Sequence, residues 1–188
     1  MIPATSASPT FHRDGYAIDP VHSCVQFRVR HLGFSRVTGR FDRFTGRFML
    51  NPVSLGSLQV EARIEAASVN TGDAERDRHL RSSDFLDVGQ FPEIVFRSTK
   101  VSALRVDTFT LTGELVLHGV RKQVDLDVTY LGEATDQQGR ERVAFEARTR
   151  LNRHEFGLTW NSVLETGGLL LGDEVDILIE VQAVREQP

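Results

Sequence analysis

Apolar and polar residues alternate over most of this sequence, and this pattern limits the possible folds more than any other feature. The clearest example is residues 58–66, where Leu58, Val60, Ala62 and Ile64 alternate with polar or charged side chains. A period of two places successive side chains on opposite faces of a β-strand. The pattern recurs at residues 25–31, 37–50, 94–96, 109–117, 124–130, 143–151 and 175–183. We therefore expect strands with one buried and one exposed face.

Eight such segments predict an all-β fold. Short turns separate most of them, which favours an antiparallel up-and-down sheet, and Gly39 and Gly46 suggest that residues 37–50 form one long, bent strand. Eight strands can close into a barrel whose interior is either packed with side chains or holds one small ligand. Small residues on the expected inner faces, such as Ala62 and Ala147, favour a hollow interior. A solid barrel is the alternative.

Residues 71–92 interrupt the alternation with a charged segment that predicts helix and turn. Asp73 is suited to cap a first helical turn and Ser82 or Ser83 a second, and Pro92 returns the chain to extended structure. The segment has few apolar residues, so it forms no core of its own. We expect a short helical insert between the third and fourth strands, whose apolar residues cover an open end of the barrel. The alternative is a buried structural plug.

The composition fits one domain, expected at residues 15–186, after a flexible N-terminal leader at residues 1–14. The leader lacks the basic and apolar regions of a signal peptide, and no uncharged apolar run is long enough to span a bilayer. We therefore expect a cytoplasmic protein without stable membrane insertion. A net charge of −4 argues against nucleic-acid binding. The single cysteine, Cys24, excludes an internal disulfide, and the choice between a monomer and a homodimer stays open.

Charge is distributed unevenly along the chain. Residues 22–50 contain six arginines and one acid, whereas the last part of the chain, from Glu165 onward, contains six acids and one arginine. If the first and last strands close the barrel, outward arginines at positions 28 and 30 face outward acids at positions 176 and 180. Arg36 and Arg40 lie nearer a turn, where an anion site is the alternative to such pairing.

No pattern predicts a catalytic or metal site. His79 has no second histidine four residues away, and the short signatures of hydrolase, nucleotide and thiol redox sites are absent. His31 is the one histidine on an expected apolar face, either as a satisfied polar spot or as a contact that orients a ligand. Residues 152–171 predict a long loop with many apolar residues. This loop either packs against the barrel or forms a rim around the barrel opening, with Trp160 at the mouth. We predict no catalytic residue, no metal and no cofactor.

These segments together resemble the YceI-like family of polyisoprenoid-binding, lipocalin-like proteins. The resemblance runs from Tyr16 to about Val184, and its blocks are YAIDPVHSCVQFRVRHLGFSRVTGRF, SVNTGDAERDRHLRSSDFLDVGQFPEIVFRS, LTGELVLHGVRKQV, RHEFGL and GDEVDILIEV. It implies an extended eight-stranded antiparallel barrel with a helical insert. Its apolar tunnel would hold a polyisoprenoid, or a quinone-type or fatty-acid-type lipid. Many relatives look secreted, and because this chain lacks a signal peptide we do not transfer their location.

The resemblance and the inner faces together predict a ligand site inside the barrel. The expected ligand-binding residues are Phe27, Val29, His31, Phe41, Ile64, Leu80, Phe85, Phe96, Phe109, Leu111, Phe145 and Trp160, and the head-group candidates are Arg36, Arg76 and Arg78. We expect non-catalytic binding, storage or transport of a long-chain isoprenoid or a similar amphiphilic lipid. The alternatives are an enzyme that acts on an isoprenoid or quinone tail with His31 as acid or base, and a protein-interaction module with a solid barrel.

Overall fold

The computed structural model of the chain describes residues 14–51, 54–165 and 169–186. The expected leader therefore lies, except for Asp14, outside the described residues. The elements are β1 (Asp14–Ile18), β2 (Cys24–His31), β3 (Ser35–Phe41), β4 (Phe44–Asn51), β5 (Ser54–Glu65), η1 (Ala66–Ser68), β6 (Val69–Asn70), α1 (Ala74–Arg81), β7 (Glu93–Ser102), β8 (Thr108–Leu117), β9 (Val120–Thr135), β10 (Glu141–Asn152), η2 (Arg153–Phe156) and β11 (Leu171–Arg185). Within these described ranges, no helix combines the length and the apolar character that crossing a bilayer requires.

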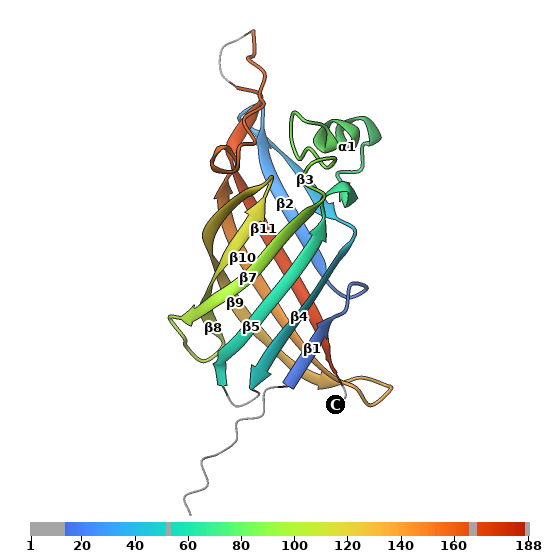
Figure 1. Cartoon of the computed structure of the whole chain (residues 1–188), viewed down its shortest axis with the longest axis vertical. Helices are drawn as coiled ribbons and strands as arrows, with labels where there is room; N and C mark the ends of the chain where they lie inside the picture. Colours follow the sequence, from blue (N-terminus) through green and yellow to red (C-terminus); the bar gives the residue numbers. More distant parts are fainter. Residues whose placement is uncertain (1–13, 52–53, 166–168, 187–188) are drawn as a thin grey trace, which may run out of the picture.

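The strands form one antiparallel sheet that closes on itself as a barrel (Figure 1). The closed ring follows the order β1-β4-β5-β7-β8-β9-β10-β11, and β1 pairs with β11 to complete it, with Ile18 opposite Ala183. The insert with α1 lies between β5 and β7, the third and fourth strands of the predicted order. The predicted fold, an eight-stranded antiparallel barrel with a short helical insert, is confirmed.

The last strand, β11, has two partners on one side. Its C-terminal part pairs with β1 and its N-terminal part with β2, where Val175 lies opposite Val29. Strand β3 follows β2, and its other side pairs with β6 only at Arg40 and Phe41. Among the described residues, positions 35–39 of β3 therefore have no ladder partner on that side, and α1 lies beside this part of the wall (Figure 1).

The prediction of one long strand at residues 37–50 is wrong, because the chain breaks into β3 and β4 at Asp42 and Arg43. The backbone NH of Asp42 donates to the Ser68 carbonyl (3.1 Å), and the NH of Arg43 donates to the Ser68 hydroxyl (3.0 Å). Ser68 thus provides hydrogen bonds at the break. Beyond the break, β4 pairs with β5 in the barrel, whereas β3 pairs with β2.

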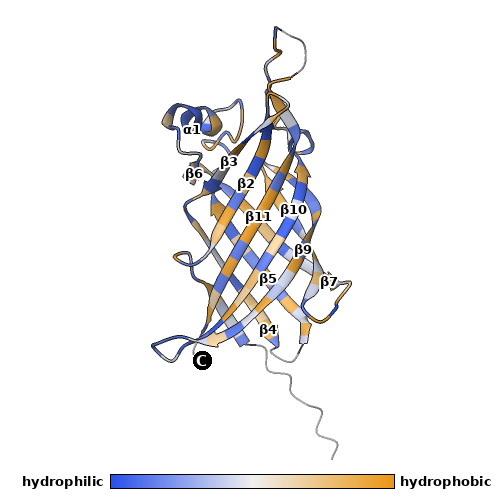
Figure 2. Cartoon of the chain, turned by 180° about the vertical axis from the view of Figure 1, so that it is seen from behind, coloured by the Kyte–Doolittle hydropathy of each residue, from blue (hydrophilic) through white to orange (hydrophobic). Residues whose placement is uncertain are grey.

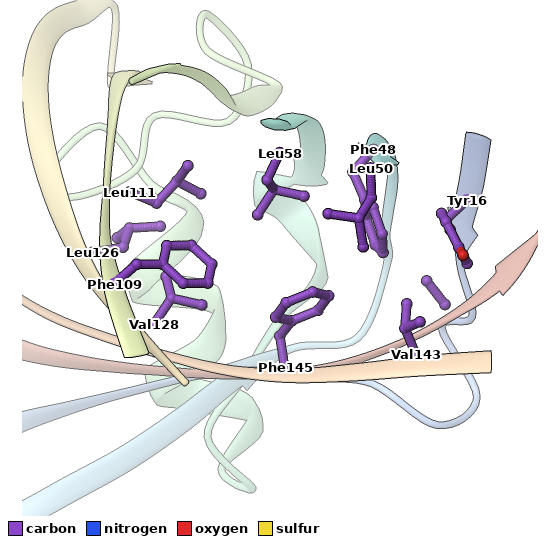
Figure 3. Close-up of a cluster of buried hydrophobic side chains, with 11 residues drawn as sticks. Tyr16, Phe48, Leu50, Leu58, Phe109, Leu111, Leu126, Val128, Val143 and Phe145 are labelled. Carbon is purple, nitrogen blue, oxygen red and sulfur yellow. The ribbon is translucent and has the colours of Figure 1, made fainter. Parts of the chain in front are cut away.

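The alternation of the sequence becomes the inner and outer faces of the wall, visible as alternating colours along β10 and β11 (Figure 2). At the end that holds β1 and the C-terminus, inward side chains form a packed cluster, which we call the packed end (Figure 3). It consists of Tyr16, Phe48, Leu50, Leu58, Phe109, Leu111, Leu126, Val128, Val143, Phe145 and Ala183. The rings of Tyr16 and Phe48 stack at 5.1 Å, and Phe145 meets Phe48 edge-on at 5.7 Å.

The insert forms α1 near the opposite end of the barrel (Figure 1). Asp73 caps the helix as predicted, because its carboxylate accepts hydrogen bonds from two backbone NH groups of the first turn (3.1 and 2.9 Å). Arg81 ties the helix to the preceding chain by donating to the carbonyls of Ala67 and Val69 (2.7 Å each). Ser82 ends α1, and its hydroxyl donates back to the carbonyl of His79 in the last turn (2.7 Å). The same hydroxyl accepts a hydrogen bond from the backbone NH of Asp84 (3.3 Å), so Ser82 caps the turn that follows, as predicted, although the described residues form no second α-helix there.

The first and last strands are neighbours, as the uneven charge predicts. Arg28 on β2 lies opposite Asp176 on β11. However, Asp176 accepts a hydrogen bond from Arg150 on β10 (2.7 Å), and Cys24, not an arginine, lies opposite Glu180. The strand pairing is therefore confirmed, whereas the predicted ion pairs are not among those that the described residues form.

We predict that Gly113→Ala lowers the free energy of unfolding by about 1–3 kcal/mol. Gly113 on β8 lies opposite Ser98, next to a bulge in β7, and a Cβ there would lie 2.6 Å from the carbonyl oxygen of Arg97 and overlap the Phe96 ring. A backbone carbonyl cannot move aside as a flexible side chain does. Urea unfolding measures the loss. Gly89→Ala is the control, because nothing lies within 4 Å of its Cβ position, and equal losses would contradict this explanation.

Candidate functional site

The barrel contains a cavity of about 570 Å³. Ligand pockets in proteins commonly measure about 300–1,000 Å³. The wall of the cavity comes from the inner faces of the strands, from the insert and from the segment that follows β10, and most of its side chains are aliphatic or aromatic. A solid barrel would leave no such space, so the structure favours the hollow interior over the filled alternative.

The packed end forms the floor of the cavity. Phe48, Leu111 and Phe145 belong to the packed cluster and also line the cavity. Tyr16 and Leu50 belong to the same cluster without lining it, so further side chains lie beneath the floor (Figure 3). The mouth of the cavity is therefore at the end that carries the insert.

Most of the side chains predicted to contact a ligand line the cavity. They are Phe27, Val29, His31, Phe41, Ile64, Leu80, Phe85, Phe96, Leu111, Phe145 and Trp160. Phe109 does not line it. Its ring faces the barrel interior as the alternation requires, but it is 3% exposed and packs beneath the floor, 6.4 Å from the ring of Phe145. The alternation gives the face of a strand and not the height along the barrel axis, which explains the misplacement of Phe109.

The three head-group candidates lie in different places. Arg76 lines the cavity, and its guanidinium donates to the hydroxyl (2.7 Å) and the carbonyl (3.0 Å) of Thr71. Arg78 lines a separate polar hollow beside α1 and pairs with Glu75 at 3.6 Å. Arg36 is exposed on the outer face of β3, because its neighbour in the strand points inward. Of the three, Arg76 is the one placed to meet a bound molecule.

Three rings from two separate segments meet at the mouth of the cavity. The His79 ring on α1 lies 4.7 Å from the Trp160 ring and 5.0 Å from the Phe85 ring, and Phe85 and Trp160 are 5.1 Å apart. All three residues line the cavity. His79 Nε2 also lies 2.8 Å from a carboxylate oxygen of Asp84, which fixes the orientation of the ring. The insert and the segment after β10 therefore contact each other at the mouth.

Arg153 is a cavity residue that the sequence did not reveal. Its side chain is 5% exposed, and its guanidinium donates to the carbonyls of Leu158 (2.6 Å), Trp160 (2.8 Å) and Gly172 (2.9 Å). Burial lowers the pKa of Arg153, and Asp173, 3.8 Å away, opposes this effect. Arg153 therefore fastens the Trp160 segment to the start of β11.

Few polar side chains line the cavity: His31, Thr71, Arg76, His79, Thr149 and Arg153. The His31 ring lies 3.5 Å from the Ser35 hydroxyl and has no carboxylate partner in the part of the chain that the structure describes. Among the same residues, no group of three or more His, Cys, Asp or Glu side chains is placed to hold a metal ion. The wall offers apolar contact over most of its area and a few groups that can orient a polar end.

Known proteins share this architecture. Residues 16–183 match the family model of the YceI-like domain. A UPF0312 protein of Azotobacter vinelandii is 38% identical over 176 residues, which cover 91% of this chain and 87% of the relative. The YceI protein of Campylobacter jejuni matches with a TM-score of 0.74 and 28% identity over 84% of this chain and 90% of that chain. A polyisoprenoid-binding domain from Saccharophagus degradans has the same fold, with a TM-score of 0.65 and 18% identity over 91% of this chain and 98% of that one.

We predict that Arg153→Lys loosens the Trp160 segment and costs about 2 kcal/mol of stability. A lysine ammonium keeps the charge but lacks the planar fork that reaches three carbonyls. Because Trp160 is the only tryptophan, a red shift and stronger acrylamide quenching of its fluorescence measure the change. The control is Arg150→Lys, at an exposed arginine near the end of β10. An unchanged Trp160 spectrum in the Arg153 variant would show that Arg153 does not hold this segment.

Proposed function

The chain belongs to the YceI-like family, and from this premise we propose that it binds a long-chain isoprenoid or a similar amphiphilic lipid inside the barrel. The binding is non-catalytic and serves storage or transport of the lipid. The observation that carries the proposal is an apolar cavity with a packed floor. The Saccharophagus degradans neighbour, described as polyisoprenoid-binding, supports the same class of ligand.

The wall supplies the affinity for the tail of the lipid. Each buried methylene group contributes about 0.8 kcal/mol, so a long tail binds with few polar contacts. Phe27, Phe41 and Phe96 line the cavity and offer broad apolar surfaces to such a tail. Apolar contact discriminates length and width better than chemical identity. Quinone tails and fatty-acid chains are therefore compatible with the same cavity.

In this proposal, the polar end of the lipid lies beside the insert. Arg76 uses Nε and Nη2 for its bonds to Thr71, and no described residue engages its Nη1. A guanidinium donor suits an oxygen-rich head such as a phosphate, a carboxylate or a quinone carbonyl. With the floor closed by the packed end, the tail lies inward and the head lies near Arg76.

The surroundings of His31 support binding over catalysis. General acid–base catalysis needs a group of suitable pKa within hydrogen-bonding reach of the reacting atom, and such a histidine is commonly oriented by a third group. The hydrogen-bonding neighbour of the His31 ring is the Ser35 hydroxyl, at 3.5 Å. Arg153 donates to three backbone carbonyls through Nε and Nη1, and its buried Nη2 has no hydrogen-bond partner among the described residues. These groups suit the fixing of a polar end better than the transfer of a proton.

We predict that Ala147→Phe weakens lipid binding at least about tenfold, because a ring on this lining residue fills part of the cavity. Native mass spectrometry of freshly purified protein detects bound lipid, and quenching of Trp160 fluorescence during titration with a polyprenyl phosphate measures affinity. Ala134→Phe is the control, because Ala134 is exposed on β9.

The proposed function is refuted if the purified protein contains no lipid and takes up no polyprenyl phosphate, quinone or fatty acid. Conversion of an added lipid to a product would identify an enzyme instead. In that case, a His31→Ala variant that binds normally without turnover would assign the chemistry to His31.

A further inference from the structure

Four apolar side chains project into solvent at the mouth end of the barrel, and we call them the apolar tip. Phe34 and Leu32, between β2 and β3, are 85% and 36% exposed, and Val163 and Leu169, before β11, are 77% and 49% exposed. The two segments are joined, because the NH of Leu32 donates to the carbonyl of Leu170 (2.9 Å) and Val163 pairs with Leu169. In Figure 1 the described residues before β11, on either side of positions 166–168, project beyond the barrel at the end opposite the C-terminus.

The turn that carries Phe34 has an unfavourable backbone shape. Leu32 has a φ of 54°, in the left-handed region that disfavours residues with a Cβ, and Gly33 follows with a φ of 77°. This strained turn does not bury its aromatic side chain. An exposed apolar cluster of this kind is typical of a site that contacts a partner. Backbone strain alone does not mark such a site, because Ala103, beside the exposed Leu104 and Val106 at the other end of the barrel, has a φ of 50°.

Arginines without partners flank the apolar tip. Arg30 and Arg36 lie opposite each other on β2 and β3, and Arg28 lies further along β2. None of these three forms an ion pair with a residue that the structure describes, and residues 28–40 contain no acid. Like charges on opposite residues of a sheet repel each other, so this pair does not stabilise the sheet. Acidic side chains of β11 also lie at this end: Asp176, opposite Arg28, pairs with Arg150, and Asp173 pairs with Arg153. The exposed Glu165 and Glu174 reduce the positive charge of the three arginines without cancelling it.

Exposed apolar residues also occur at the packed end. Leu104 and Val106, between β7 and β8, are 50% and 87% exposed. Arg105 and Asp107 beside them carry opposite charges, and the cavity does not extend to these residues. The mouth end is therefore distinguished by its combination of apolar tip, unpaired arginines and access to the cavity.

We propose that the apolar tip, with Arg28, Arg30 and Arg36, docks the mouth of the barrel on the surface of an anionic phospholipid bilayer. The apolar side chains enter the headgroup region, and the guanidinium groups bind lipid phosphates. Docking is reversible, and it lets a lipid pass between the bilayer and the cavity without crossing bulk water. This inference goes beyond lipid binding and does not depend on which lipid the cavity holds.

An anionic bilayer fits this surface better than another protein does. Stable protein interfaces bury about 800 Å² on each partner over closely packed surfaces. The apolar tip instead belongs to two turns at the end of a barrel (Figure 1). Fluid lipid closes around such projections, and the arginines complement its negative surface charge.

Co-sedimentation of the full chain with vesicles tests the proposal. We expect binding to vesicles of equal parts phosphatidylcholine and phosphatidylglycerol, weaker binding to phosphatidylcholine alone, and loss of binding as salt rises. Phe34→Ser weakens binding at least about tenfold, and so does Arg30→Gln combined with Arg36→Gln on the anionic vesicles. The matched controls are Val106→Ser and Arg47→Gln, which alter exposed side chains toward the packed end.

Variants with a single tryptophan locate the contact. Trp160→Phe removes the only natural tryptophan, and Phe34→Trp or Val106→Trp then introduces one at either end of the barrel. We expect phospholipids with brominated acyl chains to quench the fluorescence of the Phe34→Trp protein and to leave that of the Val106→Trp protein unchanged.

Absence of binding to anionic vesicles, or equal losses for Phe34→Ser and Val106→Ser, would overturn the docking proposal. A dimer that Phe34→Ser dissociates, in a protein that binds no vesicles, would assign the apolar tip to a second copy of the chain and also overturn it. The Ala147→Phe variant separates docking from lipid binding, because its cavity is partly filled. Vesicle binding by a protein that takes up no lipid would support docking and refute only the proposed function.

Discussion

The closure of the sheet through β11 is the constraint on which the rest of the structure depends. Along one side β11 pairs with β10, and along the other it pairs first with β2 and then with β1. A single strand therefore joins the mouth of the barrel to its packed end. Closure pairs most of the edges that an open sheet would expose, except the side of β3 at residues 35–39 among the described residues, and shields the interior from water. The partner of β11 changes from β2 to β1 between Glu180 and Ala183. This change separates the mouth end of the barrel from the packed end.

One part of the barrel interior is packed and stabilises the fold, and the other part is the cavity. Unfilled apolar volume costs stability relative to a filled core, and about 570 Å³ of the barrel is left unfilled. The compensating contacts are concentrated at the packed end, where Tyr16, Phe48 and Phe145 form a chain of ring contacts. Phe145 belongs to both parts, because it is buried in the cluster and also lines the cavity. The same aromatic layer therefore stabilises the fold and sets the depth of the cavity.

The alternation was enough to predict the barrel and the faces of most strands, because the direction of a strand side chain depends on the local backbone. It did not predict β1 or the break between β3 and β4. Depth along the barrel was not predictable in this way. Phe96 and Phe109 fit the same pattern, yet one lines the cavity and the other lies beneath its floor. The sequence also did not predict contacts between distant segments. An example is Ser68, which accepts hydrogen bonds from Asp42 and Arg43 at the break between β3 and β4. Arg153 is buried and donates hydrogen bonds to three carbonyls. Nothing in a single sequence distinguishes it from arginines whose side chains are exposed.

Along residues 35–39 of β3, the described chain places no ladder partner on the side of the insert, and α1 lies beside this part of the wall (Figure 1). Leu80 and Phe85 of the insert line the cavity through side-chain contacts. Such contacts rearrange much faster than a β-ladder opens. For the proposed lipid, this means that release and uptake take place while the rungs of the sheet stay intact. The residence time of the lipid and the lifetime of the folded barrel are governed by different contacts, so either can change without the other.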